Sequence, residues 1–142
     1  MSGFLLDTNV ISELVKLKPE RRVTSWVEST DEALLYLSVL TFGEIRRGIS
    51  ILPQTKRRTA IENWLVAGLS VRFAGRILVI DAAIADQWGI LSGAAQLRGV
   101  SLPVIDGLLA ATALHHNLTL VTRNTRDVSA TNVSTFNPWG RP

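Results

Sequence analysis

Asp106 is the acidic residue that is hardest to explain as an ordinary surface charge. It lies in VIDGLLAATAL, a segment that is apolar nearly all round the helix it is expected to form. A carboxylate in a buried helix is costly unless it is paired or coordinated. Gly107, Ala110 and Ala113 are small neighbours that leave room for a ligand to approach it. The alternative is an acid that caps the helix after Pro103.

Three more acids stand where a carboxylate could do chemistry. Asp7 and Asp127 each follow an apolar run that suits a buried strand, and Glu44 lies in the first turns of an expected helix. Structural roles explain each of them as well. Asp7 begins the sequence Asp-Thr-Asn, whose residue types favour helix caps, and Glu44 suits the positive end of a helix dipole. The loop that holds Asp127 looks like an ordinary polar loop, and periodicity does not decide whether Glu44 faces a cleft or water.

The elements that must position these acids alternate short apolar strands with helices. The expected strands are 4–6, 33–38, 77–80, 118–122 and a weaker one at 132–136. The expected helices are 10–17, 20–28, one that follows Thr41 and ends at Pro53, about 55–73, one capped by Asp81 that stops at Gly99, and one from Pro103 to about His116. This alternation predicts an α/β fold with a mostly parallel sheet covered on both faces. Ligands in such folds bind beyond the carboxyl ends of the strands, where Asp7 and Asp127 are expected.

The residue types at these positions indicate a hard cation. The chain has no cysteine, and His115 and His116 suit the last turn of a helix better than a metal site. Oxygen ligands alone favour Mg²⁺ or Mn²⁺ over zinc. Two carboxylates about 4 Å apart repel by roughly 4 kcal/mol at an effective dielectric of 20, and a divalent ion would offset that repulsion. With a net charge of +3 and twelve arginines, the suited chemistry is hydrolysis of a phosphodiester.

Four segments resemble one known family. LLDTNVISEL, TFGEIRRGI, VIDGLLAATAL and LVTRNTRDV, with the closing FNPW, are similar to the PIN-domain endonucleases, and most of all to the VapC and FitB branch of type II toxin–antitoxin systems. The resemblance extends from Phe4 to Trp139, and the motifs occur in the family order. It implies a single PIN-like domain over residues 1–142, built as a three-layer α/β/α sandwich. It also implies a toxin that hydrolyses RNA with Mg²⁺, or with Mn²⁺ as a substitute.

The resemblance assigns the acids by position. Asp7 matches the first family acid, Glu44 the second and Asp106 the third. Some relatives carry Asp at the position of Asn124, whereas here the carboxylate comes three residues later, at Asp127. We therefore predict one set of catalytic and metal-binding residues: Asp7, Glu44, Asp106 and Asp127. Three neighbours are secondary candidates: Asn124, Thr122 and Asn9.

The resemblance also implies partners. These are an RNA substrate and a cognate antitoxin, usually a small DNA-binding protein whose C-terminal segment wraps the toxin. A homodimer or a toxin–antitoxin hetero-oligomer is expected, with DNA contacted only through the antitoxin. No apolar stretch of about 18 residues exists and the N-terminus lacks a basic signal region, so we expect a cytoplasmic protein without a membrane partner.

Two alternatives compete with a nuclease. Receiver domains need a lysine late in the chain, but the lysines are Lys16, Lys18 and Lys56. Haloacid-dehalogenase-like phosphatases need a second Asp two residues after the first, where this chain has Asn9. The other alternative is a non-catalytic PIN-fold module that binds RNA or protein, which loss of an acid would signal.

Overall fold

A parallel sheet forms the centre of the molecule. The computed structural model describes residues 3–140. Its strands are β1 (Phe4–Leu6), β2 (Leu35–Ser38), β3 (Ile77–Leu78), β4 (Thr119–Val121) and β5 (Thr135–Phe136). They lie in the order β3-β2-β1-β4-β5, and every neighbouring pair is parallel. The chain therefore starts at the central strand and builds outward in both directions, which places a topological switch point between β1 and β4.

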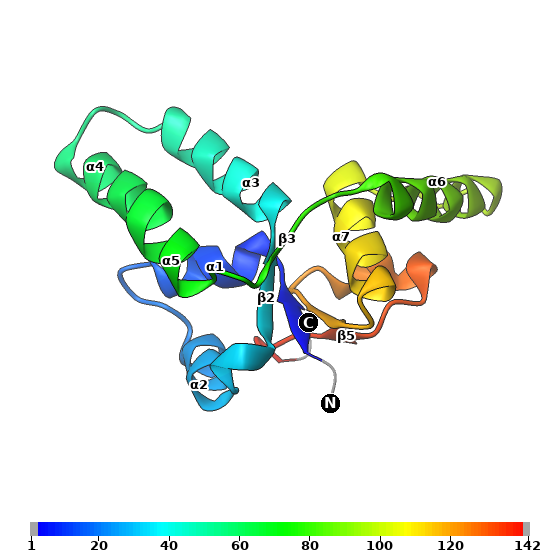
Figure 1. The fold of residues 1–142 in the computed structure, drawn as a ribbon, viewed down its shortest axis with the longest axis horizontal. Helices are drawn as coiled ribbons and strands as arrows, with labels where there is room; N and C mark the ends of the chain where they lie inside the picture. Colours follow the sequence, from blue (N-terminus) through cyan, green and yellow to red (C-terminus); the bar gives the residue numbers. More distant parts are fainter. Residues whose placement is uncertain (1–2, 141–142) are drawn as a thin grey trace.

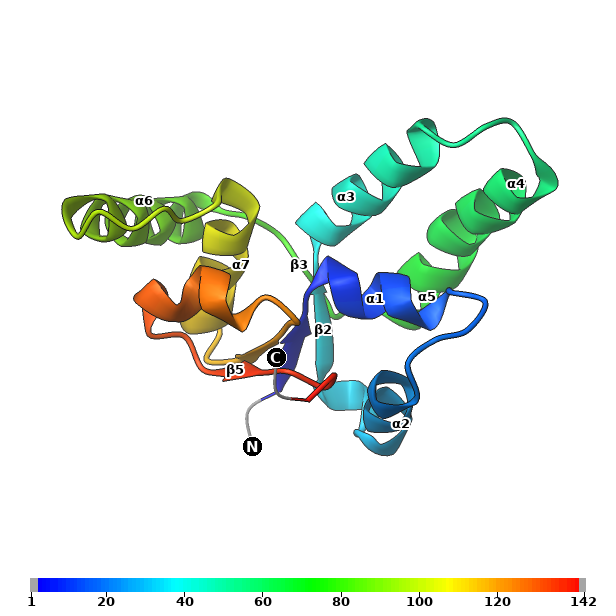
Figure 2. The same cartoon turned by 180° about the vertical axis from the view of Figure 1, so that it is seen from behind.

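Helices cover both faces of this sheet. The α-helices are α1 (Thr8–Leu14), α2 (Arg21–Ser29), α3 (Val39–Ser50), α4 (Lys56–Asn63), α5 (Ser70–Arg72), α6 (Ala82–Leu97) and α7 (Val104–His115). Figures 1 and 2 show α3, α4 and α5 on one side of the sheet and α6 and α7 on the other. In the described part of the chain, no helix has the length and apolar character needed to cross a membrane.

Each face of the sheet has its own hydrophobic cluster. Leu6 and Val121 contribute to a cluster that includes residues of α1, α2 and α3. Leu5 and Leu120 contribute to a second cluster, with α7 residues. Because successive residues of a strand point to opposite faces, β1 needs apolar side chains at consecutive positions. The predicted three-layer α/β/α sandwich is confirmed.

The strands and helices occupy the predicted places, but several boundaries differ. The second strand starts at Leu35, because Asp31 caps a 3₁₀ turn at Glu32–Leu34. Helix α3 starts earlier than expected, because the Ser38 side chain accepts a hydrogen bond from the Leu40 N–H at 3.1 Å. The segment predicted as one helix over 55–73 contains a π-helical turn at Trp64–Leu69. The polar loop after β4 becomes a 3₁₀ helix at Thr125–Thr131.

Candidate active site

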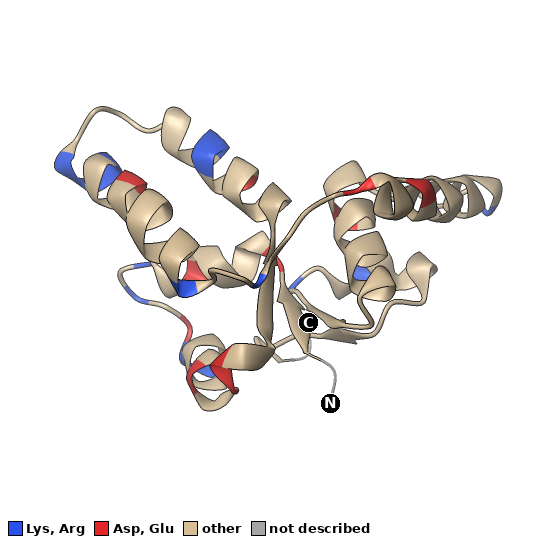
Figure 3. Cartoon of the chain, viewed as in Figure 1, with Lys and Arg blue, Asp and Glu red and all other residues tan. Residues whose placement is uncertain are grey.

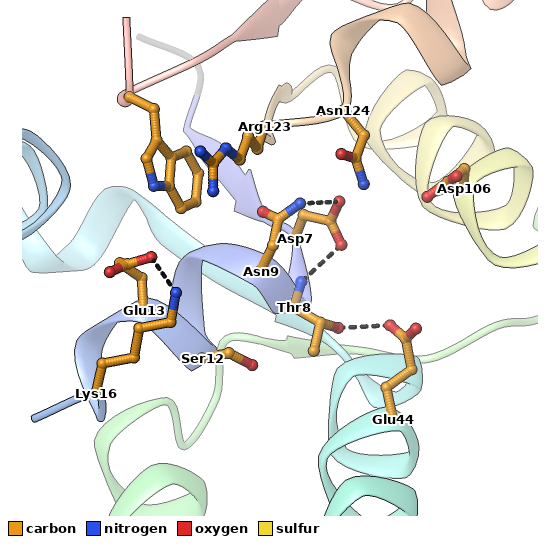
Figure 4. A pocket seen from close by; sticks show the side chains of 11 residues that line it. Asp7, Thr8, Asn9, Ser12, Glu13, Lys16, Glu44, Asp106, Arg123 and Asn124 are labelled. Carbon is orange, nitrogen blue, oxygen red and sulfur yellow. Dashed lines mark hydrogen bonds and ion pairs between the residues drawn. The ribbon is translucent and has the colours of Figure 1, made fainter. Parts of the chain in front are cut away.

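A cavity of about 350 Å³ lies at the carboxyl ends of the central strands. Asp7, Glu44 and Asp106 all line it, from three separate segments of the chain (Figure 4). Asp7 follows β1, Glu44 lies in α3 and Asp106 lies in the first turn of α7. The fold thus brings together three of the four predicted acids.

Asp7 is held rigidly at the first position of this site. Its side chain is 6% exposed and accepts hydrogen bonds from the Thr8 N–H at 2.6 Å and the Thr122 hydroxyl at 2.7 Å. Burial raises the pKa of Asp7 above its ordinary value, and the charges of Glu44 and Asp127 raise it further, although the two hydrogen bonds act in the opposite direction. Asp7 is also the N-cap residue of α1, so the helix-cap interpretation of the Asp-Thr-Asn sequence is confirmed for a residue that also lines the cavity.

Glu44 faces the cavity. Its Oε1 accepts a hydrogen bond from the Thr8 hydroxyl at 2.5 Å, and the same hydroxyl lies 3.2 Å from the Thr41 hydroxyl oxygen. Thr8 directly follows Asp7, so this bond ties α3 to the end of β1. The orientation that helical periodicity left open is decided by this contact between elements.

Asp106 is the least constrained of the three acids. It is half-buried, and within residues 3–140 its carboxylate has no hydrogen bond or ion pair. Burial raises the pKa of Asp106 to about 6, with added repulsion from Asp7, Asp127 and Glu44. A carboxylate without partners beside other negative charges is unfavourable for stability, and this points to a role in binding or chemistry.

The fourth predicted acid lies outside the cavity lining. Asp127 is exposed on the 3₁₀ helix, whereas Asn124 lines the cavity beside Asp106 (Figure 4). The Asp127 charge nevertheless raises the pKa of both Asp7 and Asp106. The neutral Asn124 side chain thus lines the cavity, whereas the Asp127 carboxylate lies outside the lining and affects the acids through its charge.

The other secondary candidates orient Asp7. The buried Thr122 hydroxyl donates to Asp7 and accepts from the Asn124 N–H at 3.0 Å. The Asn9 amide donates to Asp7 Oδ2 at 3.3 Å and to the Thr122 hydroxyl at 3.4 Å. Asn9 Oδ1 is buried without a hydrogen-bond partner in the described part of the chain. These residues form the support of the first acid.

The cavity is also lined by residues that the sequence analysis did not identify as site candidates. Glu13 is only 4% exposed and forms an ion pair with Lys16 at 2.9 Å. Burial acts to raise the pKa of Glu13, but bonds from the Glu20 N–H, Lys16 and Trp139 hold it below its ordinary value. The spacing of Glu13 and Lys16, three residues apart in a helix, is the one sequence signal for this pair. Trp139, which also lines the cavity, is buried.

The donor chemistry of the cavity fits a hard cation. Asp7, Glu44, Asp106 and Asn124 offer only carboxylate and amide oxygens and an amide nitrogen, and oxygen is what Mg²⁺ and Mn²⁺ prefer. In the side-chain positions of residues 3–140, however, no three Asp, Glu or His residues are grouped closely enough to hold one ion. Shared coordination by all three acids therefore requires side-chain rotation toward the cavity centre.

Comparisons with known proteins identify one family. Residues 4–132 match the PIN domain. The chain is 38% identical over 135 residues to Toxin FitB of Neisseria gonorrhoeae, which covers 95% of this chain and 97% of the relative. It is also 38% identical over 135 residues to VapC ribonuclease Y4jK of Sinorhizobium fredii, covering 95% and 96%.

Solved structures agree with this match. The crystal structure of FitAcB from Neisseria gonorrhoeae superimposes with a TM-score of 0.92 at 38% identity, over 97% of this chain and 99% of that one. DNA-bound VapBC from Salmonella typhimurium gives a TM-score of 0.79 at 21% identity, over 97% and 99% of the two chains. The similarity to the Salmonella typhimurium structure, at 21% identity, shows a shared fold only.

Proposed function

The chain belongs to the PIN-domain family, and from this premise we propose that it is the toxin of a type II toxin–antitoxin system, a divalent-metal-dependent endoribonuclease. The observation that carries the proposal is the convergence of Asp7, Glu44 and Asp106 on one cavity from three separate segments. Relatives that carry the names toxin and ribonuclease, at 38% identity over almost their whole length, support it.

Asp7, Glu44 and Asp106 are the residues that would hold Mg²⁺, with Mn²⁺ as a substitute. When bound, such an ion lowers the pKa of a coordinated water and offsets the charge of a phosphate. The chain's own residues prepare the site. Thr122 and the Thr8 N–H fix the Asp7 carboxylate, and the Thr8 hydroxyl directs Glu44 toward it. Asp106 keeps its oxygens free for a ligand.

The proposed partners follow from the solved relatives. One solved relative, 36% identical to this chain, is FitAB bound to a DNA fragment. We propose that this chain likewise binds a cognate antitoxin and contacts DNA only through it, within a homodimer or a toxin–antitoxin hetero-oligomer. The substrate is RNA.

Purified wild type, Asp7→Asn and Asp106→Asn should be compared for cleavage of RNA with Mg²⁺ and with EDTA. We expect cleavage by the wild type in Mg²⁺ only, and at least about a hundredfold loss in both variants, since each removes a charge with little change of volume. Asp86→Asn is the matched control, because Asp86 is exposed on α6. Wild-type rates in Asp7→Asn or Asp106→Asn would overturn the assignment of these acids, and absence of cleavage by the wild type in Mg²⁺ would favour the non-catalytic RNA- or protein-binding module.

The same assay tests whether Asp127 or Asn124 fills the fourth catalytic position. We propose that Asp127 acts there through its charge, so Asp127→Asn should lower kcat/KM by roughly tenfold, about 1.4 kcal/mol in transition-state stabilisation. Asn124→Ala should cost less, because a neutral amide contributes no charge. A larger loss in Asn124→Ala would reverse the assignment and make the residue that lines the cavity the functional one.

A further inference from the structure

Two cationic side chains line the same cavity as the acids, and they differ in how they are paired. Lys16 is neutralised by Glu13 at 2.9 Å. Arg123 lines the cavity without an ion pair to any carboxylate of residues 3–140. Some other basic residues are paired away from the cavity: Arg72 and Arg76, for example, both pair with Glu32. Arg123 therefore brings an uncompensated positive charge to the acidic cavity.

Arg123 is also held in place. Its guanidinium carbon lies 5.3 Å from the centre of the Trp139 ring, a cation–π contact. Trp139 is only 7% exposed, and it lines the cavity together with the buried Glu13. Glu13 in turn accepts a hydrogen bond from the Glu20 N–H at 2.9 Å. A buried platform thus supports an arginine that is itself exposed, and Figure 4 shows its guanidinium near Asn9 on the wall of the cavity.

We propose that Arg123 binds a backbone phosphate of the RNA strand next to the phosphate that occupies the acid site. This inference rests on the proposed function. A cation–π contact does not use up the N–H donors of a guanidinium, and these donors can match two phosphate oxygens at once. Three acids without such a cation would repel a polyanion. Trp139 is the positioning residue for Arg123, through the cation–π contact.

The test measures RNA binding apart from cleavage. In the Asp106→Asn background, Arg123→Gln, Arg123→Lys and Arg126→Gln should be titrated with a fluorescein-labelled single-stranded oligouridylate of about 12 nucleotides, within the size range of single-strand sites. Dissociation constants are taken from anisotropy at several NaCl concentrations. Arg126→Gln is the matched control, because Arg126 is exposed three residues along the chain and does not line the cavity. Circular dichroism verifies that each variant is folded.

We expect Arg123→Gln to weaken binding about tenfold and to lower the slope of log K against log salt by about 0.7, the value for one lost phosphate contact on a single strand. Arg123→Lys should keep the slope but lose several-fold in affinity, since a lysine has neither the fork nor the stack. Arg126→Gln should change affinity by less than about twofold.

Equal losses in Arg123→Gln and Arg126→Gln, or an unchanged salt slope in Arg123→Gln, would overturn the inference. The proposed function is judged separately, by wild-type cleavage. If the wild type cleaves RNA, and Arg123→Gln in the Asp106→Asn background binds RNA as tightly as Asp106→Asn alone, only the proposed phosphate contact of Arg123 fails. If the wild type cleaves no RNA but Arg123→Gln binds it selectively worse than Arg126→Gln, the phosphate contact stands and the nuclease proposal fails.

Discussion

At the scale of single residues, Asp7 combines a structural and a chemical role. Oδ1 accepts the Thr8 N–H that caps α1, while Oδ2 accepts from Thr122 and Asn9. Asp106 has no such partners among residues 3–140, although its environment is also negative. The first acid is thus held in position by the fold, and the third is kept available, at the expense of stability in the absence of a ligand.

The raised pKa of Asp106 predicts a specific dependence of stability on pH. The folded state holds a proton up to a pKa of about 6, whereas an unfolded Asp releases it near its ordinary value of 3.8. The contribution of Asp106 to the free energy of unfolding is therefore present below about pH 4 and is lost as the pH rises through about 6. Asp106→Asn removes this loss, so in metal-free buffer the variant should gain stability relative to wild type between pH 4 and 7.

Urea denaturation at pH 4.5, 5.5 and 7.0 in EDTA measures this difference. Asp86→Asn, which removes a carboxylate from the exposed surface of α6, is the control. A difference between Asp106→Asn and wild type that does not grow with pH, or that grows equally in the control, would contradict the prediction.

At the scale of elements, the contact between α6 and α7 positions the third acid. A Cβ atom at Gly107 would lie 3.0 Å from both Cδ1 and Nε1 of Trp88 and 3.2 Å from Leu102 Cδ2. Only a residue without a side chain lets the indole of α6 approach α7 so closely. Gly107 directly follows Asp106, so this packing sets how the beginning of α7 faces the cavity.

Gly107→Ala should therefore lower the free energy of unfolding by about 1–2 kcal/mol, the cost of overpacking less the gain in helix propensity. It should also slow RNA cleavage, because the displaced turn carries Asp106. Gly89→Ala is the matched control: nothing lies within 4 Å of its added Cβ, so it should raise stability by about 0.5–1 kcal/mol. Chemical denaturation and cleavage rates test both. Equal stabilisation by the two substitutions would show that Trp88 moves aside without cost.

At the scale of the whole molecule, the order of the sheet determines where charge collects. The central strand β1 comes first in the chain and β4 beside it comes late, so the ends of distant segments meet at one point. Acids gather there, although the net charge of the chain is +3. Several basic residues lie where α3 ends and α4 begins, as Figure 3 shows, and there Arg46 and Arg58 pair with Glu62. The cavity itself combines the three acids with Lys16 and Arg123.

This arrangement predicts that Mg²⁺ or Mn²⁺ raises the melting temperature of the metal-free protein, because the acids are brought together only in the folded state. The gain is about 2.7 kcal/mol at a hundredfold excess over the dissociation constant. Glu44→Gln should reduce it. Thermal melts across millimolar concentrations of each metal, with Na⁺ at matched ionic strength as the control, test the prediction. A melting temperature that neither metal changes would argue against a metal site.

The α/β class, the parallel sheet and the three acids that line the cavity could all be predicted from the amino-acid sequence. Buried parallel strands need continuous apolar runs such as Phe4–Leu6, and helices need apolar periodicity, so both are encoded locally. The segment that holds Asp106 was informative for the same reason, because a carboxylate among apolar residues is visible without any contact.

Which side chains contact one another depends on how the elements pack, and this could not be predicted from the sequence. Glu44 is directed into the cavity by Thr8, 36 residues earlier, and Asp7 is oriented by Thr122, 115 residues later. Local periodicity gives the angle of a residue round its own helix but not the distance between two elements. Two further features could not be predicted for the same reason. One is the 3₁₀ helix, which places Asn124 at the cavity and Asp127 outside it. The other is the contact between Trp139 and Arg123.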